Sequence, residues 1–285
     1  MYTMKRKGKE FKEIAMRKQD ERGKRHKKGM GKNQIIIIIA AVILLAEAGG
    51  GLGFYLYNSD QKAKVSEEKA KEADPDKIQE QYDKLKDTVA VDADDPMFRK
   101  VDFAAAQAEN PDIYAWIWIP GTNVDYPILR SETEDDAYYL NHTIDKSEGL
   151  PGTIYVEKYN AKDFSDPVTV VYGHNMKNGS MFADLHKYED QEFFNNNPYV
   201  YIYLPDQTLK YRIFAAVTFD DRYLFGNYNF SVPLDFQTYL DELKSSIDGH
   251  VNPEVNVTQE TGILTLSTCI GDSPSQRWLV NATRE

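Results

Sequence analysis

Short apolar stretches separated by turn residues recur through the C-terminal two thirds of the chain. In eight of them Val, Ile, Tyr and Trp predominate over five to eleven residues, a pattern that predicts strands. The predicted strands are 114–119, 125–129, 153–157, 168–174, 199–204, 209–219, 263–269 and 277–283. Because eight short strands in one domain favour a closed or nearly closed barrel, we expect a mostly β fold.

Helical patterns are few in this part of the chain. Residues 101–109 read as a helix, 181–185 as a single turn, and 233–247 as a longer helix. The longer helix interrupts the connection between the sixth and seventh strands. It places these residues near one face: Leu234, Tyr239, Leu243 and Ile247.

An uninterrupted apolar run occupies residues 35–57, with the sequence IIIIIAAVILLAEAGGGLGFYLY. As a helix its 23 residues would be about 34 Å long, enough to cross a hydrocarbon core of about 30 Å. Glu47 would cost about 2.5 to 3.5 kcal/mol near the middle of a span. Cleavage of a signal peptide after Ala48 is the alternative, but the 34-residue basic leader is long for one. We expect a retained signal-anchor.

The apolar run separates a basic N-terminal segment from an acidic C-terminal one. Residues 1–34 hold 13 Lys or Arg against 4 Asp or Glu, a net charge of +9, within a total of −11. By the positive-inside rule the leader is cytoplasmic, which makes the chain a single-pass membrane protein with an extracellular acidic body. The adjacent apolar run argues against nucleic-acid binding by the basic leader.

A polar segment, residues 58–95, follows the predicted span and is dominated by Lys, Glu, Asp and Ala. We interpret it as a charged stalk that holds the body off the membrane. Ile78, Tyr82 and Leu85 form one stripe of a short amphipathic helix, which could instead dock on the body. The globular domain then comprises residues 96–285.

Cys269 is the only cysteine of the chain and ends the apolar run ILTLSTC, directly before the turn-forming residues 271–274. A lone cysteine forms no internal disulfide and cannot by itself complete a tetrahedral zinc site. Two interpretations remain, a small buried hydrophobe and a reactive thiol.

Thiol catalysis needs a neighbouring acid or base and a donor for the developing oxyanion. His174 ends the strand 168–174 much as Cys269 ends its own, so the two can meet at one rim of a barrel. Arg277 follows the turn after Cys269, and a hairpin can return its guanidinium to the thiol. A polar strand cap and a solvated charge are the ordinary alternatives for these two residues. The remaining histidines read as residues of the leader or the surface: His26, His142, His186 and His250.

TLSTC with Cys269, YGHN with His174, and Arg277 opening the last strand together resemble the sortases. These are cysteine transpeptidases that attach proteins to the cell walls of Gram-positive bacteria. The resemblance covers residues 96–285 and implies the eight-stranded sortase-like β-barrel, with membrane anchoring by the N-terminal span. The helical segments before the barrel, and the helix at 233–247, resemble class B in particular.

The resemblance implies that Cys269 attacks the carbonyl after the threonine of a C-terminal sorting signal and forms a thioester. His174 would protonate the leaving amine and deprotonate the incoming one, and Arg277 would bind the threonine carbonyl and the oxyanion. Ser267 and Thr268 are expected to contribute to substrate binding. The implied partners are surface proteins that carry the signal, and an amine of the wall precursor or of a pilin; no cofactor is implied.

Gly271 departs from the class B pattern, which most often has an aromatic residue there; this bears on substrate preference more than on chemistry. Glu157, Asp163 and Asp166 resemble calcium-binding loops of some class A sortases, but we interpret them as solvated and expect no metal. Two alternatives to the transpeptidase stay open. One is an anchored, non-catalytic barrel that binds peptide or wall material around a buried Cys269, and the other is a hydrolytic cysteine protease.

Overall fold

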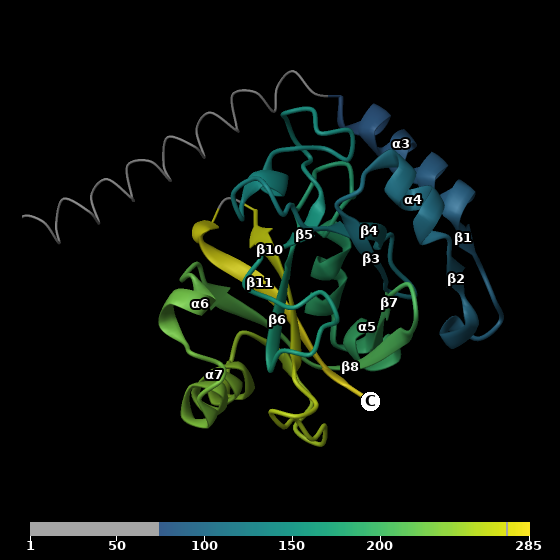
Figure 1. The fold of residues 1–285 in the computed structure, drawn as a ribbon. Helices are drawn as coiled ribbons and strands as arrows, with labels where there is room; N and C mark the ends of the chain where they lie inside the picture. Colours follow the sequence, from purple (N-terminus) through teal and green to yellow (C-terminus); the bar gives the residue numbers. More distant parts are fainter. Residues whose placement is uncertain (1–73, 272) are drawn as a thin grey trace, which may run out of the picture. The chain divides into compact units, whose positions relative to one another are not determined.

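The computed structural model describes residues 74–271 and 273–285, and eight of its strands close into a mixed β-barrel (Figure 1). Closure comes from the last strand, which pairs with both its hairpin partner and the long strand β8. In sheet order the barrel strands are β11 (Ser273–Arg284), β10 (Ile263–Ile270), β6 (Val168–Tyr172), β5 (Ile154–Val156), β4 (Asp125–Leu129), β3 (Ile113–Trp118), β7 (Tyr199–Tyr203) and β8 (Thr208–Asp220).

The predicted fold is confirmed, and all eight predicted strands are present with small shifts at their ends. Strand β6 ends at Tyr172, so His174 lies two residues beyond it rather than within it. Strand β11 begins at Ser273, four residues earlier than predicted, because Ser273 pairs with Ile270 across a short hairpin turn. The three-residue strand β9 (Gly249–Val251), which adds to the edge of β8, was not predicted.

The two faces of the barrel wall pack into different clusters. Leu264 and Leu266 of β10 belong to the large cluster that also contains Trp278 and Val280 of β11. Ile263, one residue out of phase, belongs to a second cluster. This period of two is what a pleated strand imposes, and it assigns the side chain at every second residue to the same face.

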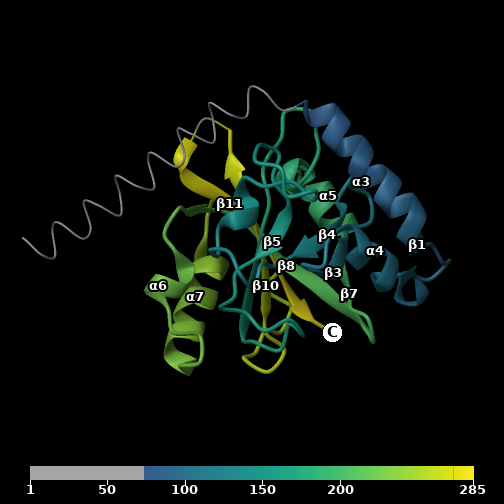
Figure 2. The ribbon, with the colours of Figure 1, turned by 45° about the horizontal axis from the view of Figure 1, so that its top comes forward.

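Two groups of helices lie on opposite sides of the barrel (Figures 1 and 2). Helices α3 (Pro75–Val89) and α4 (Phe103–Glu109) lie beside β3 and β4, and helices α6 (Leu224–Asn227) and α7 (Pro233–Ser245) lie on the other side. The remaining elements are β1 (Ala90–Val91), η1 (Pro96–Phe98), β2 (Lys100–Val101), η2 (Tyr138–Leu140), η3 (Ala183–Glu189) and α5 (Gln191–Asn196).

Helix α3 docks on the body, the arrangement that the sequence offered as an alternative to a free stalk. Asp74 caps the first turn by accepting from the Asp76 N–H, and Pro75 suits the first helical position. Tyr82 and Leu85 are buried, and the Tyr82 hydroxyl donates to the Gly152 carbonyl at 3.0 Å. The domain boundary at residue 96 stays a prediction.

Helix α7 packs on the second cluster, and the face that it buries differs from the predicted one. Leu234 and Ile247 are exposed, and the prediction that they share the buried face is wrong. The helix begins at Pro233 and ends before Ile247, and spacings of three and four select another set. The buried residues are Phe236, Tyr239, Leu240 and Leu243.

The basic leader, residues 1–34, and the predicted span, residues 35–57, lie outside the described residues. Within residues 74–271 and 273–285, we find no helix with the length and apolar character that crossing a membrane requires.

Candidate active site

Parallel pairing of β6 with β10 brings two of the predicted site residues to the same strand end. The last aligned pair is Tyr172 with Ser267, and His174 and Cys269 each lie two residues further along their chains. The Gly173 N–H donates to the Ser267 carbonyl at 3.1 Å, which extends the contact past the end of β6. Adjacent strands lie about 5 Å apart, so the two segments leave the barrel side by side.

Gly173 lets the segment leave the strand in this way. A Cβ at this position would lie 2.5 Å from the Ile154 side chain and 2.7 Å from the Phe182 ring. Both neighbours are fully buried, so neither has room to move away. The glycine of YGHN therefore fixes the path of the chain into His174.

Arg277 lies directly opposite Cys269 in the β10–β11 hairpin. The register shifts between Cys269 and Ile270, so regular pairing is interrupted at the thiol. The Arg277 Nη1 donates to the carbonyls of Pro274 and Gln276 at 2.9 and 2.8 Å. These bonds hold the guanidinium of Arg277 close to the β10–β11 turn, at the position paired with Cys269.

The thiol of Cys269 is exposed, although the six residues before it in β10 are buried. A buried, inert cysteine would have continued the burial of the strand. The interpretation of Cys269 as a buried hydrophobe is therefore wrong, and a reagent or substrate can reach the sulfur.

The imidazole of His174 is half-buried, and its Nε2 lies 2.6 Å from the Leu140 carbonyl oxygen. A carbonyl only accepts, so Nε2 carries the proton and Nδ1 is the acceptor of the neutral ring. Burial lowers the pKa of His174, the bond to Leu140 opposes that effect, and the charge of Arg277 lowers the pKa further. The site thus favours a neutral imidazole that can take a proton.

Two tyrosines extend this face of the barrel away from the thiol. Tyr172 stacks on Tyr155 of β5 with ring centroids 5.3 Å apart. Burial, first, raises the pKa of the Tyr155 hydroxyl, as do nearby acidic groups that include Cys269, whereas Arg277 acts in the opposite direction. Tyr155 therefore lies within the electrostatic range of both Cys269 and Arg277.

Glu157 follows β5 and is half-buried rather than solvated, contrary to its interpretation from the sequence. The Tyr223 hydroxyl donates to its Oε2 at 2.9 Å. Burial raises the pKa of Glu157 to about 7, against the effect of the Tyr223 bond and with a further increase from Asp136. Among the described residues, no set of three or more His, Cys, Asp or Glu is arranged to hold a metal ion.

A sortase-domain model matches residues 117–285, more than half of the chain, and this segment includes Cys269, His174 and Arg277. The chain belongs to the sortase family. Its sortase domain is 37% identical over 164 residues to sortase B of Listeria monocytogenes, a match that covers 57% of this chain and 65% of that protein, just under two thirds. It is 31% identical over 169 residues to sortase B of Staphylococcus aureus, covering 59% and 67% of the two chains.

Solved structures of sortase B share the fold of this sortase. Sortase B of Clostridium perfringens is 32% identical with a TM-score of 0.57, and the match covers 65% of this chain and all of that one. Sortase B of Bacillus anthracis, in complex with AAEK2, is 26% identical with a TM-score of 0.62, and the match covers 74% and 97%.

The two substrate-binding residues expected in this sortase lie on opposite faces of β10. Ser267 is two residues before Cys269 and shares its face, although it is largely buried. Thr268 shares the other face with Leu266, toward the large cluster, and its Oγ1 is buried without a hydrogen-bond partner. Contact between substrate and side chain therefore remains a proposal for Ser267 and for Thr268, whose side chain is buried.

Two residues that the sequence did not single out contact the backbone of Cys269. The Asn175 side-chain amide and the His186 Nε2 lie 3.2 and 3.0 Å from the Cys269 carbonyl oxygen. His186 is partly exposed, with 21% of its side chain accessible, and it also contacts the backbone of the site. Asn175 directly follows His174 in YGHN, and that adjacency was the one signal available in the sequence.

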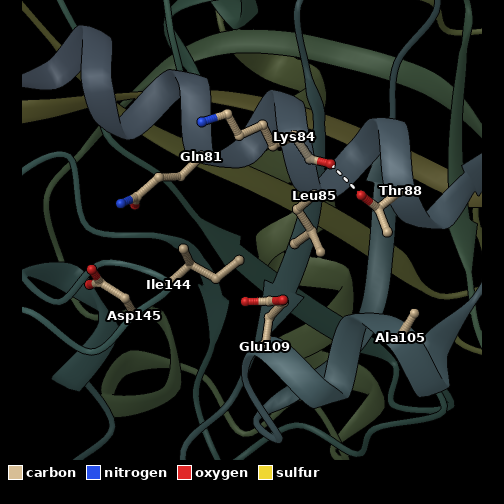
Figure 3. Close-up of a pocket in the computed structure, with 8 residues that line it drawn as sticks. All are labelled: Gln81, Lys84, Leu85, Thr88, Ala105, Glu109, Ile144 and Asp145. Carbon is tan, nitrogen blue, oxygen red and sulfur yellow. Dashed lines mark hydrogen bonds between the residues drawn. The ribbon is translucent and has the colours of Figure 1, made fainter.

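A separate cavity of about 320 Å³ lies between α3, α4 and the loop after η2. Figure 3 shows its charged side chains arranged around apolar ones, with the Thr88 hydroxyl bonded to the Lys84 carbonyl. Its lining includes none of the residues of the Cys269 site described above, so the cavity is distinct from that site. The lining residues are Gln81, Lys84, Leu85, Thr88, Ala105, Glu109, Ile144 and Asp145.

Proposed function

We propose that this sortase is a class B-like cysteine transpeptidase that transfers proteins from a C-terminal sorting signal to an amine. One observation carries the proposal: the exposed Cys269 lies opposite Arg277 and at the same strand end as His174, inside a sortase domain. Nucleophile, base and cation are thus supplied by three neighbouring segments of one barrel rim.

In the first half-reaction the Cys269 sulfur attacks the carbonyl carbon after the threonine of the signal. The thiol proton passes to Nδ1 of the neutral His174 and from there to the departing amine, so the C–N bond breaks as the thioester forms. The lowered pKa of His174 suits these two proton transfers, because the ring starts neutral and readily gives up the proton that it takes.

Arg277 would stabilise the negative charge on the carbonyl oxygen during both half-reactions. Its guanidinium stays charged at any working pH and presents a planar fork of donors. Its place opposite Cys269 is on the same face as the sulfur, as expected for a group that contacts the reacting carbonyl.

In the second half-reaction an amine attacks the thioester carbon and loses a proton to His174, which returns it to the sulfur as the C–S bond breaks. The acceptor would be an amine of the wall precursor or of a pilin. The donor proteins would carry a signal of the form Asn-Pro-x-Thr or a Ser/Pro-led variant, and residues 35–57 would anchor the enzyme with its domain outside the cell.

The test uses the full chain in detergent with a panel of quenched peptides that carry these signals, with and without a free amine. Mass spectrometry should find cleavage after threonine, an acyl adduct on Cys269 and an amine-dependent product. Cys269→Ala is the control and should form no adduct.

Cleavage that gives only the free acid in the presence of amine would replace the transpeptidase with a hydrolytic protease. An absence of adducts across the panel, together with a thiol inert to iodoacetamide, would favour the non-catalytic barrel.

A further inference from the structure

The backbone carbonyl of the nucleophile is held from one side by two side chains. Asn175 Nδ2 lies 3.2 Å and His186 Nε2 lies 3.0 Å from the Cys269 carbonyl oxygen. These contacts join segments 83 and 94 residues away in sequence to the peptide that follows the thiol. Strand pairing does not require them, since the hairpin and the β6–β10 pair already hold β10.

His186 is itself held in place on two sides. Its Nδ1 lies 2.6 Å from Glu189 Oε1, and its ring stacks on Trp278 with centroids 6.0 Å apart and planes at 21°. Trp278 is in turn fixed by its indole N–H, which donates to the Leu185 carbonyl at 2.8 Å. The imidazole therefore has one orientation available, with Nε2 toward Cys269.

Proton counting shows that the carbonyl keeps a donor in either state of His186. In the neutral ring, Nδ1–H donates to Glu189, Nε2 accepts from Asn175 Nδ2 at 3.0 Å, and the second Asn175 amide proton reaches the Cys269 carbonyl. In the charged ring, Nδ1 and Nε2 both donate, to Glu189 and to the carbonyl. Asn175 and His186 thus act as one unit.

Fixing this carbonyl also fixes the backbone of the nucleophile. The peptide unit between Cys269 and Ile270 is planar, so the Ile270 N–H points opposite to the Cys269 carbonyl, toward its partner Ser273 in the hairpin. A peptide that pairs with Ser273 on one edge and contacts Asn175 and His186 on the other resists rotation. The thiol of Cys269 therefore keeps its orientation.

We propose that Asn175, His186 and Glu189 are positioning residues that hold the Cys269–Ile270 peptide plane and thereby orient the thiol of Cys269 toward His174 and Arg277. The proposal rests on the proposed function for its catalytic consequence, but the held carbonyl is observable without substrate. Because Asn175 directly follows His174, one short loop positions both the base and the peptide of the nucleophile.

The test compares variants of the full chain in detergent. Asn175→Asp keeps the size of the side chain but replaces the donor with an acceptor that repels the carbonyl. His186→Ala removes the side chain that orients the Asn175 amide, and His186→Gln restores a polar side chain without the bond to Glu189. Asn195→Asp, on the exposed side of α5, makes the same chemical change away from the site and is the matched control.

Two rates separate positioning from loss of structure. Alkylation of Cys269 by iodoacetamide needs only an accessible thiol, whereas acylation by a signal peptide also needs that thiol to be oriented toward His174 and Arg277. Asn175→Asp should acylate about 10- to 100-fold more slowly than wild type with KM and alkylation unchanged. His186→Gln should recover part of the rate lost in His186→Ala, and Asn195→Asp should match wild type.

The single cysteine gives a readout that requires no substrate. Chain made with cysteine labelled with ¹³C at its carbonyl carries one labelled site, at residue 269. Loss of a donor should move that resonance upfield in Asn175→Asp and His186→Ala, and not in Asn195→Asp.

An unchanged resonance in both site variants would overturn the proposal, as would acylation at the wild-type rate or a parallel fall in alkylation. If wild type forms no acyl adduct but the resonance shifts as expected, the proposed function fails and the held carbonyl stands.

Discussion

The guanidinium of Arg277 and the thiol of Cys269 occupy paired positions of one hairpin, and two hydrogen bonds hold that guanidinium near its own turn. Arg277→Ala should therefore lower kcat/KM for acylation by about 10² to 10³, the usual cost of one oxyanion donor. Arg277→Lys should recover only part of the loss, since it restores the charge without the planar fork. Full recovery in Arg277→Lys would show that charge alone is used.

Burial of the His174 imidazole lowers its pKa. His174→Ala should remove nearly all turnover while Cys269 still reacts with iodoacetamide. In wild type, the pH dependence of kcat/KM reports the ionisations of the free enzyme. The midpoint of its acidic limb should lie below pH 6.5, because His174 must be neutral to take the thiol proton. An acidic limb with its midpoint clearly above pH 6.5 would mean that another group acts as the base.

At the scale of elements, α3 gains its place on the barrel mainly through one aromatic side chain. Tyr82 is buried, packs edge-on against Tyr126 with centroids 5.4 Å apart, and donates to Gly152. Tyr82→Ala should cost about 3 to 5 kcal/mol of unfolding free energy in urea titrations. The exposed Asp87→Ala on the same helix should cost little, and equal losses would mean that α3 is not docked through Tyr82.

Local patterns in the sequence were sufficient for most of the elements. The strands could be predicted because Val, Ile, Tyr and Trp concentrate where both faces of the barrel wall are covered, and β9 could not, because three residues carry no pattern. For α7 the sequence indicated a helix but not its buried face. Packing of α7 on the second cluster buries Phe236 and Leu240 and leaves Leu234 in solvent.

The candidate site also contains residues whose place the sequence could predict and contacts that it could not. The proximity of Cys269 and His174 could be predicted because each lies within two residues of a strand end, and strand ends at one rim meet whatever the loops do. The contacts of Asn175 and His186 join side chains to a distant backbone carbonyl, and such bonds leave no periodic trace in sequence. Glu157 likewise accepts a hydrogen bond from Tyr223, which lies in the connection after β8, and no local pattern predicts that contact.

Across the whole molecule, groups with shifted pKa values act on stability in opposite directions. Hydrogen bonds from Lys162 and Arg130 lower the pKa of Glu132 to about 2, so its contribution is present above pH 4.5 and is lost in acid. Burial of His174 also favours the folded state as pH rises toward 6.5. Burial of Glu157 has the reverse effect, since its pKa rises from 4.5 to about 7.

Glu157 can be isolated from these opposing groups by substitution. Between pH 4.5 and 7 the folded chain binds more protons at Glu157 than the unfolded chain does, so its contribution to unfolding free energy falls as pH rises. Glu157→Gln keeps a neutral side chain at every pH. From pH 5 to pH 8, wild type should therefore lose roughly 2 to 3 kcal/mol of unfolding free energy relative to the variant in urea titrations.

The control for this prediction is Glu192→Gln, on the first turn of α5, where the exposed carboxylate should add no such difference. A constant gap between wild type and Glu157→Gln from pH 5 to pH 8 would show that Glu157 ionises normally in the folded chain. A difference that changes with pH as expected would mean that burial outweighs the Tyr223 hydrogen bond, because burial favours the protonated carboxyl and the Tyr223 bond favours the carboxylate.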